Sequence, residues 1–298
     1  MTARTTRTTR RSEPRGRAAA ARNVSKTALL ALLLVGAAGG LGFALADTRG
    51  LTFFAFAALL ATMAAWLFGD RVLLGSLGAR VLAEAELVPV RLAVARLCAE
   101  LDLPVPRLYL LADGFPRALA LGRRPVGARL VVSQGLSIVL APAQLAAVLA
   151  HELAHIRARD IAPHTAAALV GGTLLELSRV GWRLQRALLH VLAPVAAACA
   201  HLILSPEREF AADRLAASLA GPGALADALL RLAAAADSMP FAAPPATSCL
   251  YPVVLFDPTD RVARMFDTHP PLEQRVRALR ELQRSDHAEA APSGAASA

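Results

Sequence analysis

Two uninterrupted apolar stretches dominate the first quarter of the chain. Residues 27–46 contain no charged side chain, and neither do residues 51–68. A helix rises about 1.5 Å per residue, so each stretch is long enough to cross about 30 Å of hydrocarbon. Because only Asp47, Thr48, Arg49 and Gly50 lie between them, the pattern predicts an antiparallel transmembrane helical hairpin over residues 27–69.

A cleavable signal peptide is the alternative interpretation of the first stretch. The run Ala44-Leu45-Ala46 resembles a small-residue cleavage site, and Arg10-Arg11 is a twin-arginine pair. However, the arginine pair lies far upstream of the apolar stretch, and a second stretch follows at once. We therefore favour the hairpin, and even a cleaved chain would keep residues 51–68 as an anchor.

The pattern changes after the hairpin to that of a folded domain, which we place at residues 70–285. Three short β-prone runs separated by Gly and Pro predict a small β-sheet. A helix is predicted from Pro142 through His155, with proline in its tolerated first-turn position. The predicted strands are Arg107–Leu111, Ala118–Leu121 and Arg129–Ser133.

A second pair of apolar stretches lies inside this domain, at residues 161–204. Three arginines lie in the connection between its two halves, Arg179, Arg183 and Arg186. If the pair spanned a membrane, those arginines would lie on the outer side, against the positive-inside tendency. A buried or interfacial helical hairpin is therefore the alternative to two further membrane spans.

The last part of the domain reads as amphipathic helices from Ser205 to about Gln283. A Pro-rich loop interrupts them near residues 240–258, and it is either an ordinary surface loop or a mobile cover for a cleft. Residues 286–298 are rich in Ala, Ser and Gly, and we expect a disordered tail there.

The distribution of charge narrows the choice of partners. The chain is 55% hydrophobic with a net charge of +9, and eight basic residues against Glu13 place +7 of that charge in residues 1–26. We expect this segment to be a disordered tail that orients the hairpin, so that both ends of the hairpin face the cytoplasm. The remaining +2 gives no reason to propose a nucleic-acid partner. Three cysteines without CxxC spacing argue against a disulfide scaffold or a cysteine zinc site.

The predicted helix at Pro142–His155 contains the motif H-E-x-x-H. Its two histidines, His151 and His155, are four residues apart, so both imidazoles project from one helix face and can reach one metal ion. Zinc lowers the pKa of a bound water toward about 7, and Glu152 between the histidines is placed to accept its proton. The motif alone also occurs by chance on solvated helix faces, so a third ligand is required.

The third ligand is expected in the segment after Ser205. Glu209 is followed four residues later by Asp213, so the two carboxylates share one helix face. Glu209 would complete a His/His/Glu set, and Asp213 could accept a hydrogen bond from the second nitrogen of a ligand histidine.

At this point the sequence resembles the integral-membrane zinc metalloproteases of the HtpX type, a family that includes the CAAX prenyl-protein endopeptidases. The resemblance covers roughly residues 85–285. It is carried by Pro104-Val105-Pro106-Arg107-Leu108-Tyr109, Gly122-Arg123-Arg124-Pro125, the HELAH run His151–His155, Glu209-Phe210-Ala211-Ala212-Asp213 and Thr268-His269-Pro270-Pro271 with Arg275.

The resemblance implies a mainly α membrane protein with a gluzincin-like helical zinc protease domain and a small β-sheet. It implies one Zn²⁺ on His151, His155 and Glu209, with Glu152 as general base and Asp213 in support. It also suggests that His269, assisted by Arg275, stabilises the oxyanion. From the residues alone, His269 could equally cap the turn at Pro270-Pro271.

Two segments depart from the family pattern. Arg117-Ala118-Leu119-Ala120 stands where the family usually has Asn-Ala-Phe-Ala, which puts in doubt the docking of substrate along residues Ala118, Leu119 and Ala120. Addition of an extended peptide to a strand uses main-chain groups, however, and tolerates side-chain changes. Pro206 occupies a position usually held by Arg, and neither change removes a zinc ligand or the base.

The sequence thus predicts a multi-pass protease of a bacterial-type plasma (inner) membrane, with its active site at the cytoplasmic face. The resemblance suggests polypeptide substrates such as misfolded membrane or cytosolic proteins, in membrane protein quality control and the stress response. A dedicated processing or signalling metalloprotease is one alternative. A catalytically silent membrane adaptor is another, although the intact Glu152 argues against it.

Overall fold

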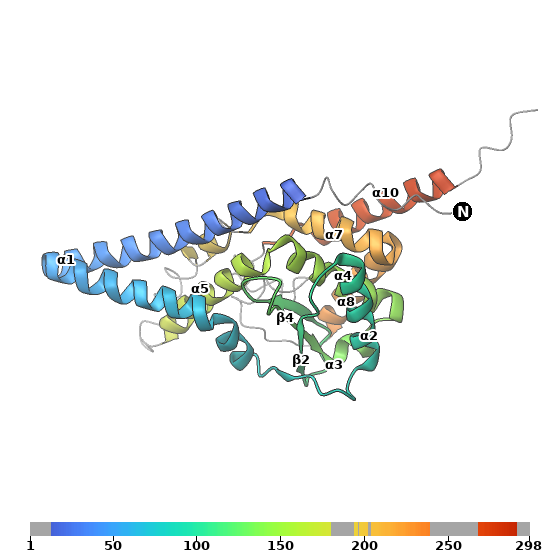
Figure 1. Ribbon diagram of the computed structural model, residues 1–298, viewed down its shortest axis with the longest axis horizontal. Helices are drawn as coiled ribbons and strands as arrows, with labels where there is room; N and C mark the ends of the chain where they lie inside the picture. The colour runs from blue at the N-terminus through green and yellow to red at the C-terminus, as the bar shows by residue number, and fades with distance from the viewer. Residues whose placement is uncertain (1–12, 180–193, 196, 202–203, 239–267, 291–298) are drawn as a thin grey trace, which may run out of the picture.

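The computed structural model describes residues 13–179, 194–195, 197–201, 204–238 and 268–290 (Figure 1). The predicted loop at 240–258 and most of the second half of the apolar pair lie outside these residues. The elements are α1 (Glu13–Ser76), β1 (Arg80–Val81), α2 (Val88–Leu101), β2 (Arg107–Leu111), β3 (Ala118–Leu121), β4 (Arg129–Ser133), α3 (Gln134–Val139), α4 (Pro142–Ala158), α5 (Ile161–Arg179), α7 (Pro206–Ala220), α8 (Pro222–Ser238) and α10 (Leu272–Ala290).

Helix α1 is broken where the sequence places the turn of the hairpin. Ala46 and Asp47 leave helical geometry, and Asp47 adopts a positive φ of 52°. The two arms fold back on each other in Figure 1. At the turn their backbones touch, because a Cβ atom added to Gly42 would lie 2.3 Å from the carbonyl oxygen of Gly50. Glycine at both positions therefore permits the close approach of the arms.

The ends of two helices differ from the predicted tails. Helix α1 begins at Glu13, so the second half of the basic segment expected to be disordered is helical. Helix α10 likewise continues to Ala290, five residues into the predicted tail that starts at 286. Residues 1–12 and 291–298 lie outside the described part of the chain.

The three predicted strands form residue for residue and belong to a four-stranded sheet of order β1-β2-β4-β3. Strand β2 pairs with β4 in parallel, and β3 pairs with β4 antiparallel, with Ala118 opposite Val132 and Leu121 opposite Arg129. The two-residue strand β1 was not predicted, since so short a run has no recognisable period. Strand β3 is an edge of this sheet.

Helix α4 is the centre of the domain and packs against α2, α7, α8 and β3. Every residue from Leu145 to Ile156 is buried. The helix begins at Pro142, and the Gln144 side chain accepts a hydrogen bond from the Ala141 amide at 3.0 Å. It ends at Ala158, and the left-handed φ of 60° at the following residue, Arg159, lets the Asp160 amide donate to the His155 carbonyl at 2.9 Å.

Helix α5 connects this core to α1. It starts directly after Asp160 and packs along the second arm of α1, where a Cβ atom on Gly69 would lie 2.1 Å from Leu169. Its first half, Ile161–Val170, is apolar but too short to span a membrane. Among the described residues, the single helix with the length and hydropathy of a span is Ser25–Ser76; α7 and α8 pass only if joined across a 120° bend.

Candidate metal centre

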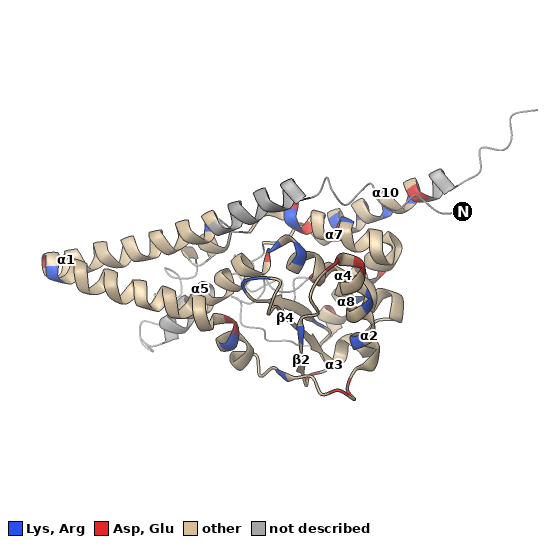
Figure 2. Ribbon diagram, viewed as in Figure 1, with Lys and Arg blue, Asp and Glu red and all other residues tan. Residues whose placement is uncertain are grey.

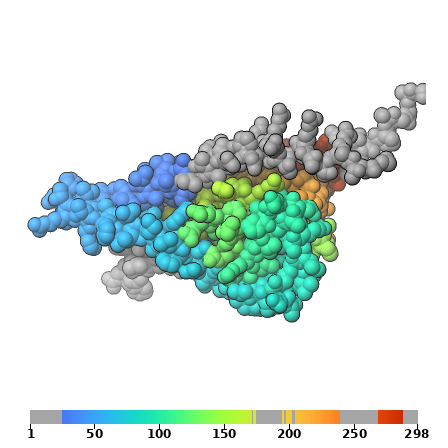
Figure 3. Space-filling model, in the orientation of Figure 1, coloured from blue at the N-terminus to red at the C-terminus, as the bar shows by residue number. Residues whose placement is uncertain are grey.

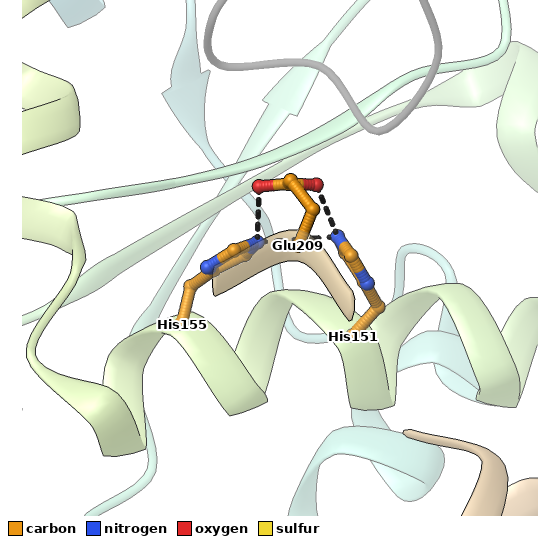
Figure 4. Close-up of side chains that lie close together, drawn as sticks. All are labelled: His151, His155 and Glu209. Atoms are coloured by element: carbon orange, nitrogen blue, oxygen red, sulfur yellow. Dashed lines mark hydrogen bonds and ion pairs between the residues drawn. The ribbon is translucent and has the colours of Figure 1, made fainter. Parts of the chain in front are cut away.

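Two histidine side chains on α4 face each other one helical turn apart. The Nε2 atoms of His151 and His155 are 3.2 Å apart, and both side chains are buried (Figure 4). The local cause is the four-residue spacing, which stacks both imidazoles on the face of α4 turned toward α7.

Glu209 on α7 completes the group. Its Oε1 lies 3.3 Å from His155 Nε2 and its Oε2 lies 3.6 Å from His151 Nε2. Glu209 lies in the first turn of α7, where a carboxylate is favoured by the helix dipole. Pro206 is the first residue of the same helix, a position that suits proline, so this departure from the family pattern leaves the ligand helix intact.

The three side chains fit a zinc ion. Their ligand atoms all lie within 4.8 Å of one another. A tetrahedral ion with bonds of about 2.0–2.2 Å sets its ligand atoms about 3.3 Å apart, close to the distances found here. In addition, Glu209 Oε2 is buried and accepts no well-formed hydrogen bond from the described residues. A cation would add a bond to this oxygen, whose nearest basic neighbours are His269 Nδ1 at 3.0 Å and His151 Nε2 at 3.6 Å.

The outer nitrogen of His151 faces a carboxylate that is itself held by an arginine. His151 Nδ1 is 2.9 Å from Asp213 Oδ1, and Arg275 donates to both Asp213 oxygens, from Nε at 2.8 Å and from Nη2 at 2.7 Å. Burial raises the pKa of Asp213, but Arg275 and His151 outweigh it and hold that pKa at about 2. The ionised carboxylate can therefore fix the ring with Nε2 turned toward the ligand group.

The outer nitrogen of His155 has a matching arrangement that the sequence analysis did not identify. His155 Nδ1 is 3.5 Å from Asp160 Oδ2, and Arg208 forms an ion pair with the other oxygen of Asp160. Although burial opposes it, His155 and Arg208 hold the pKa of Asp160 well below its usual range. Arg208 directly precedes the ligand Glu209. A basic residue next to a ligand was the sequence feature that could have indicated a charged partner near the centre.

Glu152 follows His151 on the buried side of α4, and its side chain is 3% exposed. Its carboxylate makes no hydrogen bond or ion pair within the described part of the chain, in contrast to Glu209, Asp213 and Asp160. Burial raises the pKa of the Glu152 carboxyl to about 7. The group is thus available to exchange a proton near neutral pH.

His269 and Arg275 both reach the ligand group, by different contacts. His269 Nδ1 lies 3.0 Å from Glu209 Oε2, which places its ring directly beside the centre. Arg275 Nη1 lies 3.8 Å from the same oxygen, but the strong contacts of Arg275 are those to Asp213. Its side chain is buried, so its geometry is that of a residue that positions Asp213.

The predicted substrate edge is strand β3. Ala118, Leu119 and Ala120 are all buried, and β3 packs against α4 and α5. The preceding residue, Arg117, pairs with Asp113, and its amide donates to Ser133 Oγ at 3.0 Å. Arg117 is therefore held by contacts within the domain and precedes strand β3, which begins at Ala118.

Comparison with known proteins gives the family. The model of peptidase family M48 matches residues 86–283. A "Protease HtpX homolog" of Syntrophobacter fumaroxidans is 33% identical over 265 residues, covering 81% of this chain and 93% of the relative. Another from Salinibacter ruber is 36% identical over 266 residues, covering 86% and 96%. The chain therefore belongs to peptidase family M48.

Within that family it is an HtpX-type membrane protease, as the sequence resemblance indicated. A solved structure, that of S. mikatae Ste24p, is similar with a TM-score of 0.47 and 18% identity, covering 87% of this chain and 66% of that one. Family membership makes the chain a metallopeptidase, and His151, His155 and Glu209 form a possible metal site.

Proposed function

We propose that the protein is a zinc-dependent endopeptidase that hydrolyses peptide bonds at the centre formed by His151, His155 and Glu209. The observation that carries the proposal is the convergence of these three buried side chains next to Glu152, whose carboxylate has no hydrogen-bond or ion-pair partner among the described residues. When bound there, zinc would polarise a substrate carbonyl and make water more acidic.

Glu152 would act as the base and then as the acid. It would take a proton from the attacking water as the water oxygen bonds to the peptide carbonyl carbon. The same proton would pass to the amide nitrogen, so that the C–N bond breaks and a free amine and a carboxylic acid are released. An N–H of His269, beside Glu209, would donate to the carbonyl oxygen as that oxygen gains negative charge.

An extended polypeptide is the substrate that this geometry favours. The ligand histidines and Glu152 are almost completely buried, so a folded protein surface could not bring a peptide bond to them. Edge strand β3 lies against α4, and an extended chain could add to it through main-chain hydrogen bonds, with Ala118, Leu119 and Ala120 opposite the substrate. Unfolded membrane or cytosolic polypeptides meet this requirement, in keeping with a role in protein quality control.

The properties of α1 support the proposed membrane placement. Both arms expose apolar side chains, for example Leu32 at 70% and Phe53 at 69%, as expected for a surface that contacts lipid. The basic residues of the protease domain lie at the open end of the hairpin, away from its turn (Figure 2), and α1 begins at the same end (Figure 1). By the positive-inside rule, that end would be cytoplasmic and the arms would cross the inner membrane twice.

The test compares the purified full-length protein with its Glu152→Gln variant in detergent. We expect both to bind one zinc per chain and the variant to lose casein hydrolysis by at least about 100-fold, since general base catalysis contributes about 10²–10⁴-fold. Equal, metal-independent cleavage by both proteins would refute the proposal and favour a silent adaptor. Cleavage restricted to one membrane protein would instead indicate a dedicated processing protease.

A further inference from the structure

The loop between β3 and β4 carries an exposed group of basic and apolar side chains. We call residues 122–127 the β3–β4 loop. Val126 in this loop is 80% exposed, and Arg123 and Arg124 are also exposed. Single exposed apolar residues are common on protein surfaces, so the exposure of Val126 is informative only together with the neighbours of the loop.

Those surroundings are the end of the second arm of α1. The Arg123 guanidinium lies over the Trp66 ring, 6.0 Å from its centre. Asp70, four residues after Trp66, forms an ion pair with Arg129, the first residue of β4. The β3–β4 loop is thus fixed to α1 on both sides, and the surface of the sheet region borders the second arm in Figure 3.

The residues of α1 at this level mark a membrane interface. Trp66 and Phe68 close the apolar stretch 51–68 and are 40% and 49% exposed, as in the aromatic belts found at the level of lipid headgroups. Arg71 follows them and lies 5.7 Å from the Phe68 ring. Because Arg123 contacts Trp66, the β3–β4 loop lies at the same depth as this belt.

The charge of the loop identifies the lipid chemistry. In the described part of the chain, neither Arg123 nor Arg124 forms an ion pair with an acidic side chain, whereas Arg129 and Arg117 nearby are both paired. Guanidinium groups bind phosphate with good geometry, and an anionic leaflet attracts basic side chains within a short distance of its surface. Arginines at headgroup level that have no acidic partner among the described residues therefore fit anionic phospholipids.

We propose that the β3–β4 loop is a second membrane contact of the protease domain, in which Arg123 and Arg124 bind phosphates of anionic lipids and Val126 enters the boundary between headgroups and acyl chains. The proposal rests on the membrane placement of α1 given above and not on the peptidase chemistry. Its consequence is that the domain is held against the lipid surface at two places, on α1 and at one end of the sheet beside strand β3.

A fluorescent label at position 126 tests the contact. Val126→Cys is made in full-length protein with Cys98, Cys199 and Cys249 replaced by Ala, labelled with an environment-sensitive dye, and reconstituted into phosphatidylcholine–phosphatidylglycerol vesicles with spin-labelled lipid. Ile138→Cys on α3 is the matched control, because Ile138 is equally exposed, at 79%, and lies away from the arms of α1 (Figure 1). We expect strong quenching at 126 and little at 138.

Equal quenching at the two positions would overturn the contact. Casein hydrolysis by the labelled proteins separates this result from a failure of the proposed function, because position 126 is outside the metal centre. A folded, active protein without quenching at 126 would refute only the lipid contact.

The proposed binding of lipid phosphates by Arg123 and Arg124 is tested by varying the anionic lipid content of the vesicles. Quenching at 126 should rise when phosphatidylglycerol is added to phosphatidylcholine vesicles. Arg124→Gln should lower the equilibrium constant for contact between the loop and the lipid about fivefold, the effect of roughly one interfacial cation. Arg96→Gln removes an exposed arginine from α2 and should leave quenching unchanged. Quenching that depends neither on anionic lipid nor on Arg124 would overturn the phosphate recognition.

Discussion

Helices α1 and α4 are both rich in Ala and Leu, yet they place their side chains in opposite environments. On α1 the large apolar side chains point outward, and Leu32 and Phe53 are more than two-thirds exposed. On α4 the histidines and the glutamate of the H-E-x-x-H motif are inside, with His151 at 1% and Glu152 at 3% exposed. The same helix-forming composition thus serves a lipid-facing surface in one helix and the centre of a catalytic domain in the other.

The two helices also differ in how charged groups are placed around them. The apolar stretches of α1 contain no charged residue, and their arms are joined by close backbone packing at Gly42 and Gly50. Around α4, ionised groups are buried, and they are stabilised in chains of opposite charge that run from histidine to carboxylate to arginine. Helix α5 joins the two regions, since it starts at the metal centre and packs on α1.

The largest effect is expected from breaking one buried charge chain. Arg275→Met leaves Asp213 buried and ionised without its cation, which should destabilise the fold by about 3–5 kcal/mol. The thermal unfolding midpoint in detergent, followed by circular dichroism, should fall by about 6–20 °C. The matched control is Arg280→Gln on the same helix, which removes an exposed ion pair with Asp227 and should cost under about 1 kcal/mol. Equal shifts for the two variants would contradict the role given to Arg275.

An intermediate effect is expected on metal affinity from the second chain. Asp160→Asn preserves the volume and the backbone contacts of the residue but removes the negative charge between His155 and Arg208. Loss of such a support typically weakens zinc binding by about 10–100-fold, measurable by competition with a chelator. The control Asp227→Asn removes an exposed carboxylate and should leave zinc affinity unchanged. Unchanged affinity in Asp160→Asn would show that Asp160 only caps α5.

These two charge chains also mark the limit of what the sequence could predict. Fixed spacing on one helix brought His151 and His155 together, and a helical Glu209 with Asp213 four residues later identified the rest of the ligand group. The strands could be predicted equally well, because Gly and Pro residues mark the ends of each β-prone run. Local patterns of this kind need no knowledge of the tertiary fold.

The ion pairs that the sequence did not predict depend on contacts between segments that are distant in the chain. Arg275 is 62 residues from Asp213 in the chain, and only the packing of α10 on α7 and α8 brings its guanidinium to that carboxylate. The Asp160–Arg208 pair likewise forms only after α4 and α7 pack together. Charge balance in a buried core is a property of the fold, so a single sequence shows the charged residues without showing their partners.

The smallest effect is expected in α1, where only packing is changed. Gly42→Ala places a methyl group 2.3 Å from the Gly50 carbonyl oxygen, so the arms must separate at the turn. Overpacking costs about 1–3 kcal/mol, partly offset by about 1 kcal/mol from the higher helix propensity of alanine. Gly40→Ala is the control, because a Cβ atom there meets nothing within 4 Å and should stabilise the helix slightly. Cysteine crosslinking between residues 39 and 51 should become slower in Gly42→Ala and stay unchanged in Gly40→Ala, and an unchanged rate in both would contradict close packing of the arms.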